Sequence, residues 1–255
     1  TITNVKKTFN KGTVNEKKAL NGINLHLAPG DFVTIIGGNG AGKSTMLNMI
    51  AGVYPIDSGK IEIDGVNISR EPEYKRAKYI GRVFQDPMRG TAANMEIQEN
   101  LAMALRRGKS RGLGWGIKKN EKDFYREALA QLDLGLQTRM TSKVGLLSGG
   151  QRQAMALLMS TMTPIEFLIL DEHTAALDPK TAELIMQLTD KIVKEKQLTT
   201  IMVTHNLRYA VEYGDCLIMM HQGKAIIDKA GADKKAIQVD DILGTFNEIS
   251  IECGN

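Results

Sequence analysis

A nine-residue segment, GGNGAGKST at positions 37–45, constrains this chain more than any other part of its sequence. It satisfies the pattern G-x-x-x-x-G-K-[ST], with a dense apolar stretch (32–36) before it and a helical pattern (43–51) after it. Glycines let such a loop curl until its backbone N–H groups point at phosphate oxygens, and the following helix adds the positive end of its dipole. The segment therefore predicts a strand–loop–helix unit that binds phosphate. Its members are Gly37, Gly38, Asn39, Gly40, Ala41, Gly42, Lys43, Ser44 and Thr45.

Two side chains of this phosphate loop have distinct expected roles. Lys43 would reach the β- and γ-phosphates of a nucleotide, and Ser44 would place its hydroxyl on Mg²⁺. A flexible glycine loop without a ligand is the alternative. The strand before the loop and the helix after it argue against that alternative.

A second feature is the run FLILDEHTAALDP at 167–179, where four apolar residues lead directly into Asp171 and Glu172. We expect a buried strand that runs beside the phosphate loop and ends at this pair. Asp171 would hold Mg²⁺ through its water shell, and Glu172 would polarise an attacking water. The alternative is an acidic pair that only complements a helix dipole.

The pentapeptide LSGGQ at 147–151 places small residues at a second expected helix start, 16 residues before FLILDE. A helix N-terminus of this kind is a second anion site, although a serine–diglycine sequence can also be an ordinary helix cap. Two separate phosphate-binding helix starts in one chain favour a head-to-tail dimer, in which each copy closes over the other's nucleotide. The residues expected to do so are Ser148, Gly149, Gly150 and Gln151.

Composition narrows the class of partner. The chain has 255 residues and a formal charge of only +4, with acidic and basic residues interspersed, so we expect no nucleic-acid partner. Cys216 and Cys253 match neither a metal-binding nor a redox spacing, which favours a reducing compartment. No apolar run approaches the roughly 18 residues of a membrane span, so any work at a membrane would depend on separate partner subunits.

The order of patterns predicts an α/β fold. Apolar strand patterns alternate with helical patterns through the second half of the chain, which favours a parallel sheet with helical crossovers. The first 36 residues are rich in strand patterns. The segment 94–160 shows no clear strand and predicts an inserted helical region, which contains a glycine-rich basic loop at 106–120.

The phosphate loop, LSGGQ and FLILDE together resemble the ATP-binding subunit of an ABC transporter, over about residues 1–230. The resemblance implies a RecA-like P-loop NTPase core with an N-terminal antiparallel β-subdomain and an inserted α-helical subdomain. The expected ranges are 1–86 and 162–230 for the core with its β-subdomain, 87–161 for the α-helical signature subdomain, and 231–255 for a C-terminal tail. It also implies binding of ATP with Mg²⁺, and ATP hydrolysis.

The resemblance implies further site residues, each present in this chain. Gln85 in GRVFQDP resembles the glutamine that joins the sheet to the helical subdomain and contacts Mg²⁺ and the attacking water. Asp178 resembles part of the loop that crosses the dimer interface, and His205 in IMVTHN resembles the switch histidine that contacts the γ-phosphate. Phe9 lies where such proteins place an aromatic ring against adenine, and Val14 is a second candidate for nucleotide contact.

These residues also have structural alternatives. Gln85 could cap a turn, His205 could be a surface residue and Phe9 could belong to the core. His173 departs from the family pattern, because most members have proline after the glutamate. Histidine there brings a titratable ring close to the catalytic carboxylate, and we interpret it as a tolerated structural substitution.

The resemblance implies the ATPase of a multi-subunit ABC membrane transporter, held by permease subunits at the cytoplasmic face of the membrane. The absence of fused membrane spans favours an importer, with a separate-subunit exporter, and then a soluble non-transport ABC protein, as alternatives. A small-molecule kinase would leave LSGGQ unexplained. Partners would be a second copy of the chain or a homologous ATPase, the permease and, indirectly, an extracellular solute-binding protein.

Two finer expectations follow from the same resemblance. Segments such as DEHTAALDPKTA are similar to ATPases of bacterial uptake systems for aromatic amino acids that use a lipoprotein receptor. The helical region is expected to turn about Gln85 and to receive a short helix of the permease near Met88 to Glu99. Arg89 and Glu96 are the expected contacts, and the alternative is that both are only solvated.

Overall fold

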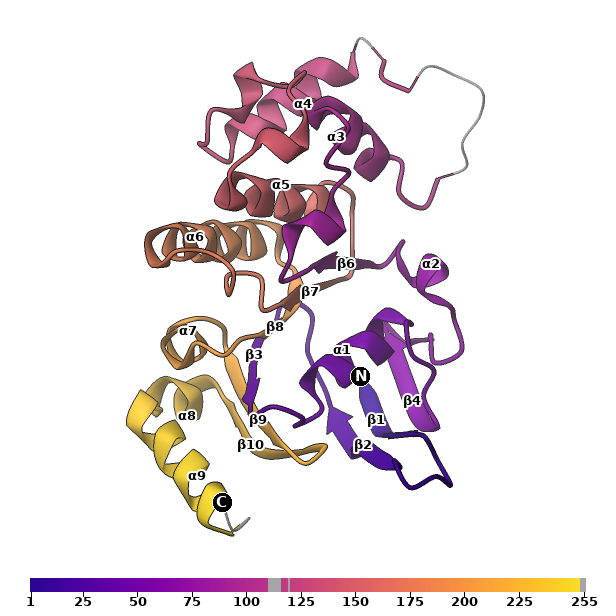
Figure 1. Ribbon diagram of the computed structural model, residues 1–255, viewed down its shortest axis with the longest axis vertical. Helices are drawn as coiled ribbons and strands as arrows, with labels where there is room; N and C mark the ends of the chain where they lie inside the picture. The colour runs from indigo at the N-terminus through magenta and orange to yellow at the C-terminus, as the bar shows by residue number, and fades with distance from the viewer. Residues whose placement is uncertain (110–115, 119, 253–255) are drawn as a thin grey trace.

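The computed structural model describes residues 1–109, 116–118 and 120–252. Figure 1 shows three parts: a central sheet, a second sheet beside it at the lower right, and a helical region at the top. Part of the 106–120 loop, including Trp115, lies outside the described residues, as does Cys253.

The central sheet has six strands in the order β10-β9-β3-β8-β7-β6. Neighbours from β9 to β6 are parallel, and β10 pairs with β9 in the antiparallel sense. The residues of β3 are all buried because helices and the second sheet cover both faces, which explains why all but Thr34 and Gly37 have large apolar side chains. The strands are β3 (Phe32–Gly37), β6 (Ile80–Val83), β7 (Phe167–Asp171), β8 (Thr199–Val203), β9 (Cys216–His221) and β10 (Lys224–Ala230).

The second sheet is antiparallel and has the order β2-β1-β4-β5. Its inward residues, such as Val5 and Ile23, share a core with the helix that follows the phosphate loop and with one face of the central sheet. This sheet matches the expected N-terminal antiparallel β-subdomain. The strands are β1 (Ile2–Phe9), β2 (Lys17–Leu25), β4 (Ser58–Ile63) and β5 (Val66–Asn67).

The helical region is inserted between β6 and β7, and no strand forms in its described residues. The fully buried Leu101, Tyr125 and Leu157 belong to one apolar cluster that continues onto the sheet. The expected helical insertion is therefore present. Its elements are η1 (Pro87–Gly90), α3 (Ile97–Leu105), α4 (Glu121–Ala130), η2 (Leu136–Thr138), η3 (Val144–Leu146) and α5 (Gly149–Thr161).

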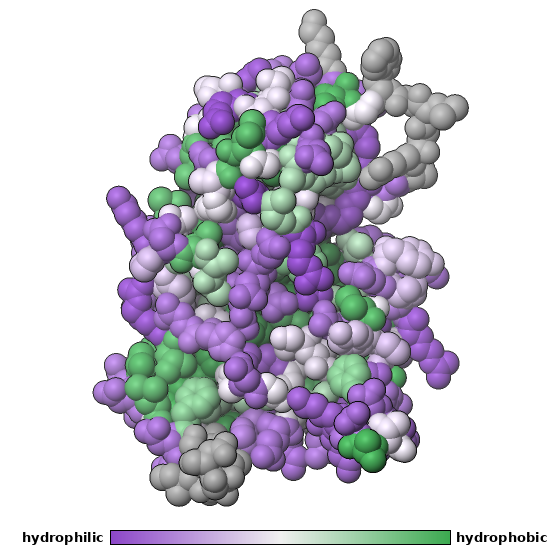
Figure 2. Space-filling view, in the orientation of Figure 1, coloured by the Kyte–Doolittle hydropathy of each residue, from purple (hydrophilic) through white to green (hydrophobic). Residues whose placement is uncertain are grey.

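The remaining helices connect the strands and cover the sheet. They are α1 (Lys43–Ala51), α2 (Glu73–Arg76), α6 (Pro179–Lys196), α7 (Leu207–Glu212), α8 (Gly231–Ala236) and α9 (Val239–Glu252). The segment expected as a tail thus carries two helices, and Ile242 of α9 is buried against Leu217 and Met219 of β9. Figure 2 shows a mostly hydrophilic face with an apolar group at the lower left, where α7 to α9 lie in Figure 1. Among the described residues, no helix has both the length and the apolarity needed to cross a bilayer.

Candidate active site

The phosphate loop connects β3 to α1 and depends on glycine at two positions. Gly37 has φ 151°, and a Cβ there would lie 2.3 Å from the carbonyl oxygen of Met220. Gly42 has φ 104°, and a Cβ there would lie 2.6 Å from the carbonyl oxygen of Ala19. Larger residues would clash with neighbouring backbone at both ends of the loop, so its tight path requires glycine.

Lys43 is the first residue of α1, and its side chain folds back over the loop. Its Nζ donates hydrogen bonds to the carbonyl oxygens of Gly37 at 2.6 Å and Gly38 at 3.1 Å. Burial lowers the pKa of Lys43, while the charges of Glu172 and Asp171 act in the opposite direction. The ammonium group is therefore largely desolvated and held beside the first residues of the loop, where a bound anion would contact it.

The carboxylate pair ends β7, as the sequence predicts. Because β7 and β8 are parallel neighbours with Asp171 opposite Val203, the residues after both strands meet at the same edge of the sheet. Glu172 Oε1 and His205 Nε2 are 2.8 Å apart there. Glu172 is mostly buried and His205 is half exposed, so the carboxylate is the inner member of this pair and the imidazole is the member nearer to solvent.

A cavity of about 210 Å³ brings most of these groups together. Phe9, Glu172 and His205 line it together with the phosphate loop. Val14 does not: it is fully exposed in the β1–β2 connection. The complete lining is Phe9, Lys17, Ala19, Asn39, Gly40, Ala41, Gly42, Lys43, Ser44, Thr45, Glu172 and His205.

Two lining residues, Lys17 and Ala19, have no motif in the sequence to mark them. Both lie in the first half of β2, which packs closely against the loop at Gly42. Side chains alternate along a strand, so the sequence places Lys17 and Ala19 on the same face of β2. It does not show that this face meets the phosphate loop. Lys17 adds a second cation to the cavity.

Asp171 makes a contact that sequence reasoning missed. Its Oδ2 accepts a hydrogen bond from Nη2 of Arg82 at 2.8 Å, and both side chains are largely buried. Arg82 lies on β6, 89 positions away in the sequence. Gln85, which follows β6, is exposed and does not line the cavity.

The LSGGQ segment forms the start of α5, away from the phosphate-loop cavity of its own chain. Ser148 and Gln151 form a reciprocal capping box, in which each side chain accepts from the other residue's backbone N–H. The start of α6 packs against it, since a Cβ on Gly150 would lie 2.3 Å from Cγ2 of Thr181. Asp178 caps α6, and its hydrogen bonds from Thr181 lower the pKa of the Asp178 carboxyl.

His173, which follows the carboxylate pair in the sequence, is buried. Its Nε2 lies 3.0 Å from Oγ1 of Thr189, and that hydroxyl donates to the carbonyl oxygen of Ile185. The ring therefore donates its Nε2–H to Thr189. Complete burial lowers the pKa of His173 to about 4, so the ring is neutral at pH 7.

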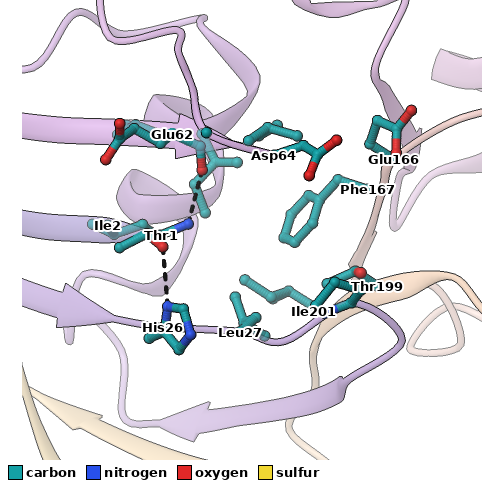
Figure 3. Close-up of a pocket in the computed structure, with 15 residues that line it drawn as sticks. Thr1, Ile2, His26, Leu27, Glu62, Asp64, Glu166, Phe167, Thr199 and Ile201 are labelled. Atoms are coloured by element: carbon teal, nitrogen blue, oxygen red, sulfur yellow. Dashed lines mark hydrogen bonds between the residues drawn. The ribbon is translucent and has the colours of Figure 1, made fainter.

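A larger cavity, of about 440 Å³, lies at the opposite ends of the central strands. Figure 3 shows its apolar wall, with Phe167 and Ile201 from the start of β7 and from β8. Thr1 closes one side, with its amino group on the carbonyl of Glu62 and its hydroxyl 3.0 Å from Nδ1 of His26. Ligands of parallel sheets bind at the carboxyl ends of the strands, so the phosphate-loop cavity is the candidate site despite its smaller size.

A third hollow, of about 380 Å³, lies between the helical region and the central sheet. Of the range 88–99, only Gly90 lines this groove. The groove is formed instead by the ends of α1, α3 and α5, by α2 and by β6 with Phe84. Its lining is Ala51, Glu73, Ala77, Ile80, Arg82, Phe84, Gly90, Met103, Ala104, Arg107, Met159 and Ser160.

The chain resembles proteins of a known family in sequence and in structure. The sequence model of the family described as "ABC transporter" matches residues 20–175. A tyrosine transport ATP-binding protein of Clostridioides difficile (strain R20291) is 43% identical over 245 residues, which cover 96% of this chain and 97% of that protein.

Solved structures share the fold over almost the whole chain. The ATP-binding cassette MJ0796, a dimer in a post-hydrolysis state bound to ADP and Pi, is 31% identical with a TM-score of 0.75; the match covers 90% of this chain and 97% of that one. A nucleotide-free ATP-binding cassette from an ABC transporter is 26% identical with a TM-score of 0.79, over 100% and 98% of the two chains. The expected fold class is therefore confirmed. With a phosphate loop, a carboxylate–histidine pair and an LSGGQ helix on this fold, the chain belongs to the ABC transporter family, as an ATP-binding subunit that hydrolyses ATP to drive transport.

Proposed function

We propose that this chain is the ATPase of a multi-subunit importer for an aromatic amino acid, and that Glu172 is its catalytic base. The observation that carries the assignment of the site is the convergence of Lys43, Glu172 and His205 on one cavity beside the phosphate loop. Lys43 would bind the β- and γ-phosphates, and Phe9 would stack on adenine at the other end of the cavity.

Glu172 and His205 divide the chemistry between them in this proposal. The Glu172 carboxylate takes up the proton of the attacking water, because it is close to the loop and mostly shielded from solvent. His205 holds that carboxylate at 2.8 Å and contacts the γ-phosphate from the open side of the cavity. Gln85 would reach the same water from its exposed position after β6.

The donor set of the site fits Mg²⁺. In the part of the chain that the structure describes, no group of three or more His, Cys, Asp or Glu side chains could hold a metal by itself. Mg²⁺ prefers one or two protein oxygens combined with nucleotide phosphates and water. The Ser44 hydroxyl, which lines the cavity, would supply one such oxygen, and Asp171 and Gln85, which are not part of the lining, would act from beyond it. The ion would neutralise charge on the phosphates.

We further propose that the site is completed by a second copy. The LSGGQ helix start would bind an anion, and its residues do not line the phosphate-loop cavity of their own chain. Ser148, Gly149, Gly150 and Gln151 of one copy would close over the nucleotide held by the other, with Asp178 at the interface. The related cassette MJ0796 forms a dimer, which supports this arrangement.

The transport role rests on relatives. The tyrosine transport ATP-binding protein of C. difficile matches this chain over nearly its full length, and other relatives are named as import ATP-binding proteins for thiamine and for spermidine/putrescine. Permease subunits would hold the chain at the cytoplasmic face of the membrane, and a solute-binding protein would deliver the amino acid. The groove beside Phe84 is a better candidate than the 88–99 surface for the permease contact, because it is hollowed.

Replacing Glu172 by Gln tests the catalytic assignment. The amide keeps the size of the side chain but is a much weaker base, so ATP hydrolysis should fall by about 10²–10⁴-fold. Binding of ATP with Mg²⁺ should survive, and the variant should run as an ATP-dependent dimer in size-exclusion chromatography.

The matched control is Glu166→Gln, an exposed carboxylate at the other end of β7. It should hydrolyse ATP at the wild-type rate. A Glu172→Gln variant that also does so would remove Glu172 from the catalytic role. Copurification of the permease and the binding protein, followed by measurement of tyrosine-stimulated ATPase activity in vesicles, tests the solute.

A further inference from the structure

Arg82 contacts two elements of the proposed site at once. Its Nη2 donates to Asp171 Oδ2 at 2.8 Å, and its Nη1 donates to Asn48 Oδ1 at 2.9 Å. Asn48 lies on α1, the helix that begins at Lys43, whereas Asp171 ends β7. One guanidinium group therefore joins the helix of the phosphate loop to the strand of the carboxylate pair.

Sheet register explains how this contact arises. β6 and β7 are parallel, with Arg82 opposite Ile169. Asp171 is two residues beyond Ile169, so its side chain lies on the same face of the sheet as that of Ile169. An arginine is long enough to cross to the neighbouring strand and reach the carboxylate.

The other surroundings of Arg82 hold its side chain in place. Its Cζ lies 4.6 Å from the centre of the Phe84 ring, and Arg89 lies 5.1 Å from the same ring. Its side chain is only 12% exposed, and it also lines the groove between the helical region and the sheet. Arg82 thus touches both that groove and Asp171.

An arginine at this position has a cost that an apolar residue would avoid. Its Nε is buried and has no hydrogen-bond partner among the described residues. A buried donor without a partner is unfavourable, and well-packed apolar side chains are often at least as stabilising as a buried ion pair. Stability alone therefore gives little reason for an arginine at this position. Its contact with Asp171 suggests a functional reason instead.

We propose that Arg82 is a positioning residue for the Mg²⁺-dependent step of nucleotide binding. It fixes the Asp171 carboxylate through Oδ2, which leaves Oδ1 for the water shell of the metal. The proposal rests on the metal role of Asp171 proposed above. It adds a residue, on a different strand, that determines how well Asp171 performs that role.

The test compares nucleotide affinity with and without metal. A fluorescent ATP analogue is titrated into each variant in excess Mg²⁺ and again in EDTA, and the ratio of the two affinities is the gain due to Mg²⁺. In Arg82→Met this gain should fall by about tenfold or more, the usual effect of removing a group that orients a metal ligand, while affinity in EDTA stays unchanged. Arg82→Lys keeps the charge but offers no planar fork, so it should recover part of the gain.

Arg89→Met is the matched control, because Arg89 lies against the same Phe84 ring and has no contact with Asp171. It should keep the full gain. If Arg82→Met cannot bind ATP in EDTA, its fold has been damaged. The Mg²⁺ gain of Arg82→Lys then tests whether Arg82 positions Asp171. A full Mg²⁺ gain in the Arg82 variant that binds normally in EDTA would overturn the proposal.

Asp171→Asn separates this proposal from the one on which it rests. If Asp171→Asn loses the Mg²⁺ gain and the Arg82 variants keep it, only the role of Arg82 fails. If Asp171→Asn keeps the gain, the metal assignment of Asp171 fails, and with it the reason for Arg82.

Discussion

Glu172 has a backbone conformation that residues other than glycine rarely adopt. Its φ is 49°, in the left-handed region, and its N–H donates to the carbonyl oxygen of Val203 at 2.9 Å. Such a conformation costs on the order of 1–3 kcal/mol and persists where the surroundings enforce it. Here β8 holds the backbone and His205 holds the side chain. The strain of this residue supports the proposed catalytic role, because it places a carboxylate where a regular strand would not.

His173 makes stability depend on pH at the same corner of the site. Its pKa is about 4 in the folded protein, because of burial, and near 6.5 when the chain is unfolded. Below pH 6.5 the unfolded chain binds more protons, so this contribution is complete above pH 6.5 and is lost as the pH falls toward 4. In nucleotide-free protein with EDTA, the free energy of unfolding should fall by roughly 2 kcal/mol between pH 7 and pH 5 from this group.

Urea unfolding at both pH values measures this loss. Other groups also titrate in that range, so the informative quantity is the difference from His173→Gln, which should lack this component. His26→Gln, at an exposed position, should keep it. An equal pH dependence in wild type and His173→Gln would contradict the pKa of the buried ring.

At the scale of elements, α1 is fixed at both ends. Gly42 and Lys43 set its start at the phosphate loop, and Arg76 of α2 closes its end. The Arg76 guanidinium is buried and donates to the carbonyl oxygens of Met49 and Ile50 at 2.7 and 2.8 Å. It also bonds the carbonyls of Glu71 and Ser69. One side chain thus satisfies the helix end and the loop that leads to α2.

Replacing Arg76 by Met should therefore destabilise the protein by roughly 2–4 kcal/mol, because several buried carbonyl groups lose their donor. Urea unfolding without nucleotide measures the change. Arg70→Met, at an exposed position a few residues earlier, should change the free energy of unfolding by less than about 0.5 kcal/mol. A loss below about 1 kcal/mol in Arg76→Met would show that water or a rearranged loop replaces the guanidinium.

Elements with a strong local pattern could be predicted from the sequence. The β3–loop–α1 unit lies close to the expected ranges 32–36, 37–45 and 43–51, and β7 ends at the carboxylate pair, where the apolar run in FLILDE predicts it. β6 could not be predicted, because IGRV is only four residues long and gains its strand conformation from pairing with β7. The sequence does not predict α9 for a similar reason, because its apolar residues are buried only by packing against β9.

At the scale of the whole molecule, the sequence predicts the site residues that belong to motifs. It does not predict the residues that only the fold brings to the site. Lys43, Glu172 and His205 belong to motifs whose strands end at one edge of the sheet, and there they line one cavity. Lys17 and Arg82 reach the site from β2 and β6, and their positions depend on sheet packing and register. No short pattern in the sequence encodes either one.

The separation of the LSGGQ helix from the phosphate-loop cavity leads to a prediction about the assembled molecule. If each site combines the loop of one copy with the LSGGQ segment of the other, Lys43→Ala and Ser148→Arg should each abolish hydrolysis by damaging different halves of the site. Mixing the two inactive variants should restore activity. About half of randomly formed dimers contain one of each, and one of their two sites is intact, so recovery should approach about a quarter of the wild-type rate.

Phosphate release after mixing equal amounts of the two variants measures this recovery. The control is a mixture of Lys43→Ala with a chain carrying both substitutions, in which every loop lacks its lysine and no site is intact. That mixture should remain inactive. Each variant is first shown to keep the wild-type thermal unfolding midpoint, so that loss of activity reflects the site. Failure of the first mixture to exceed the control would mean that the phosphate loop and the LSGGQ helix do not act in one site shared between copies. Recovery would place the active site between two chains, and it would explain why Ser148 and Gln151 lie outside the lining of the phosphate-loop cavity of their own chain.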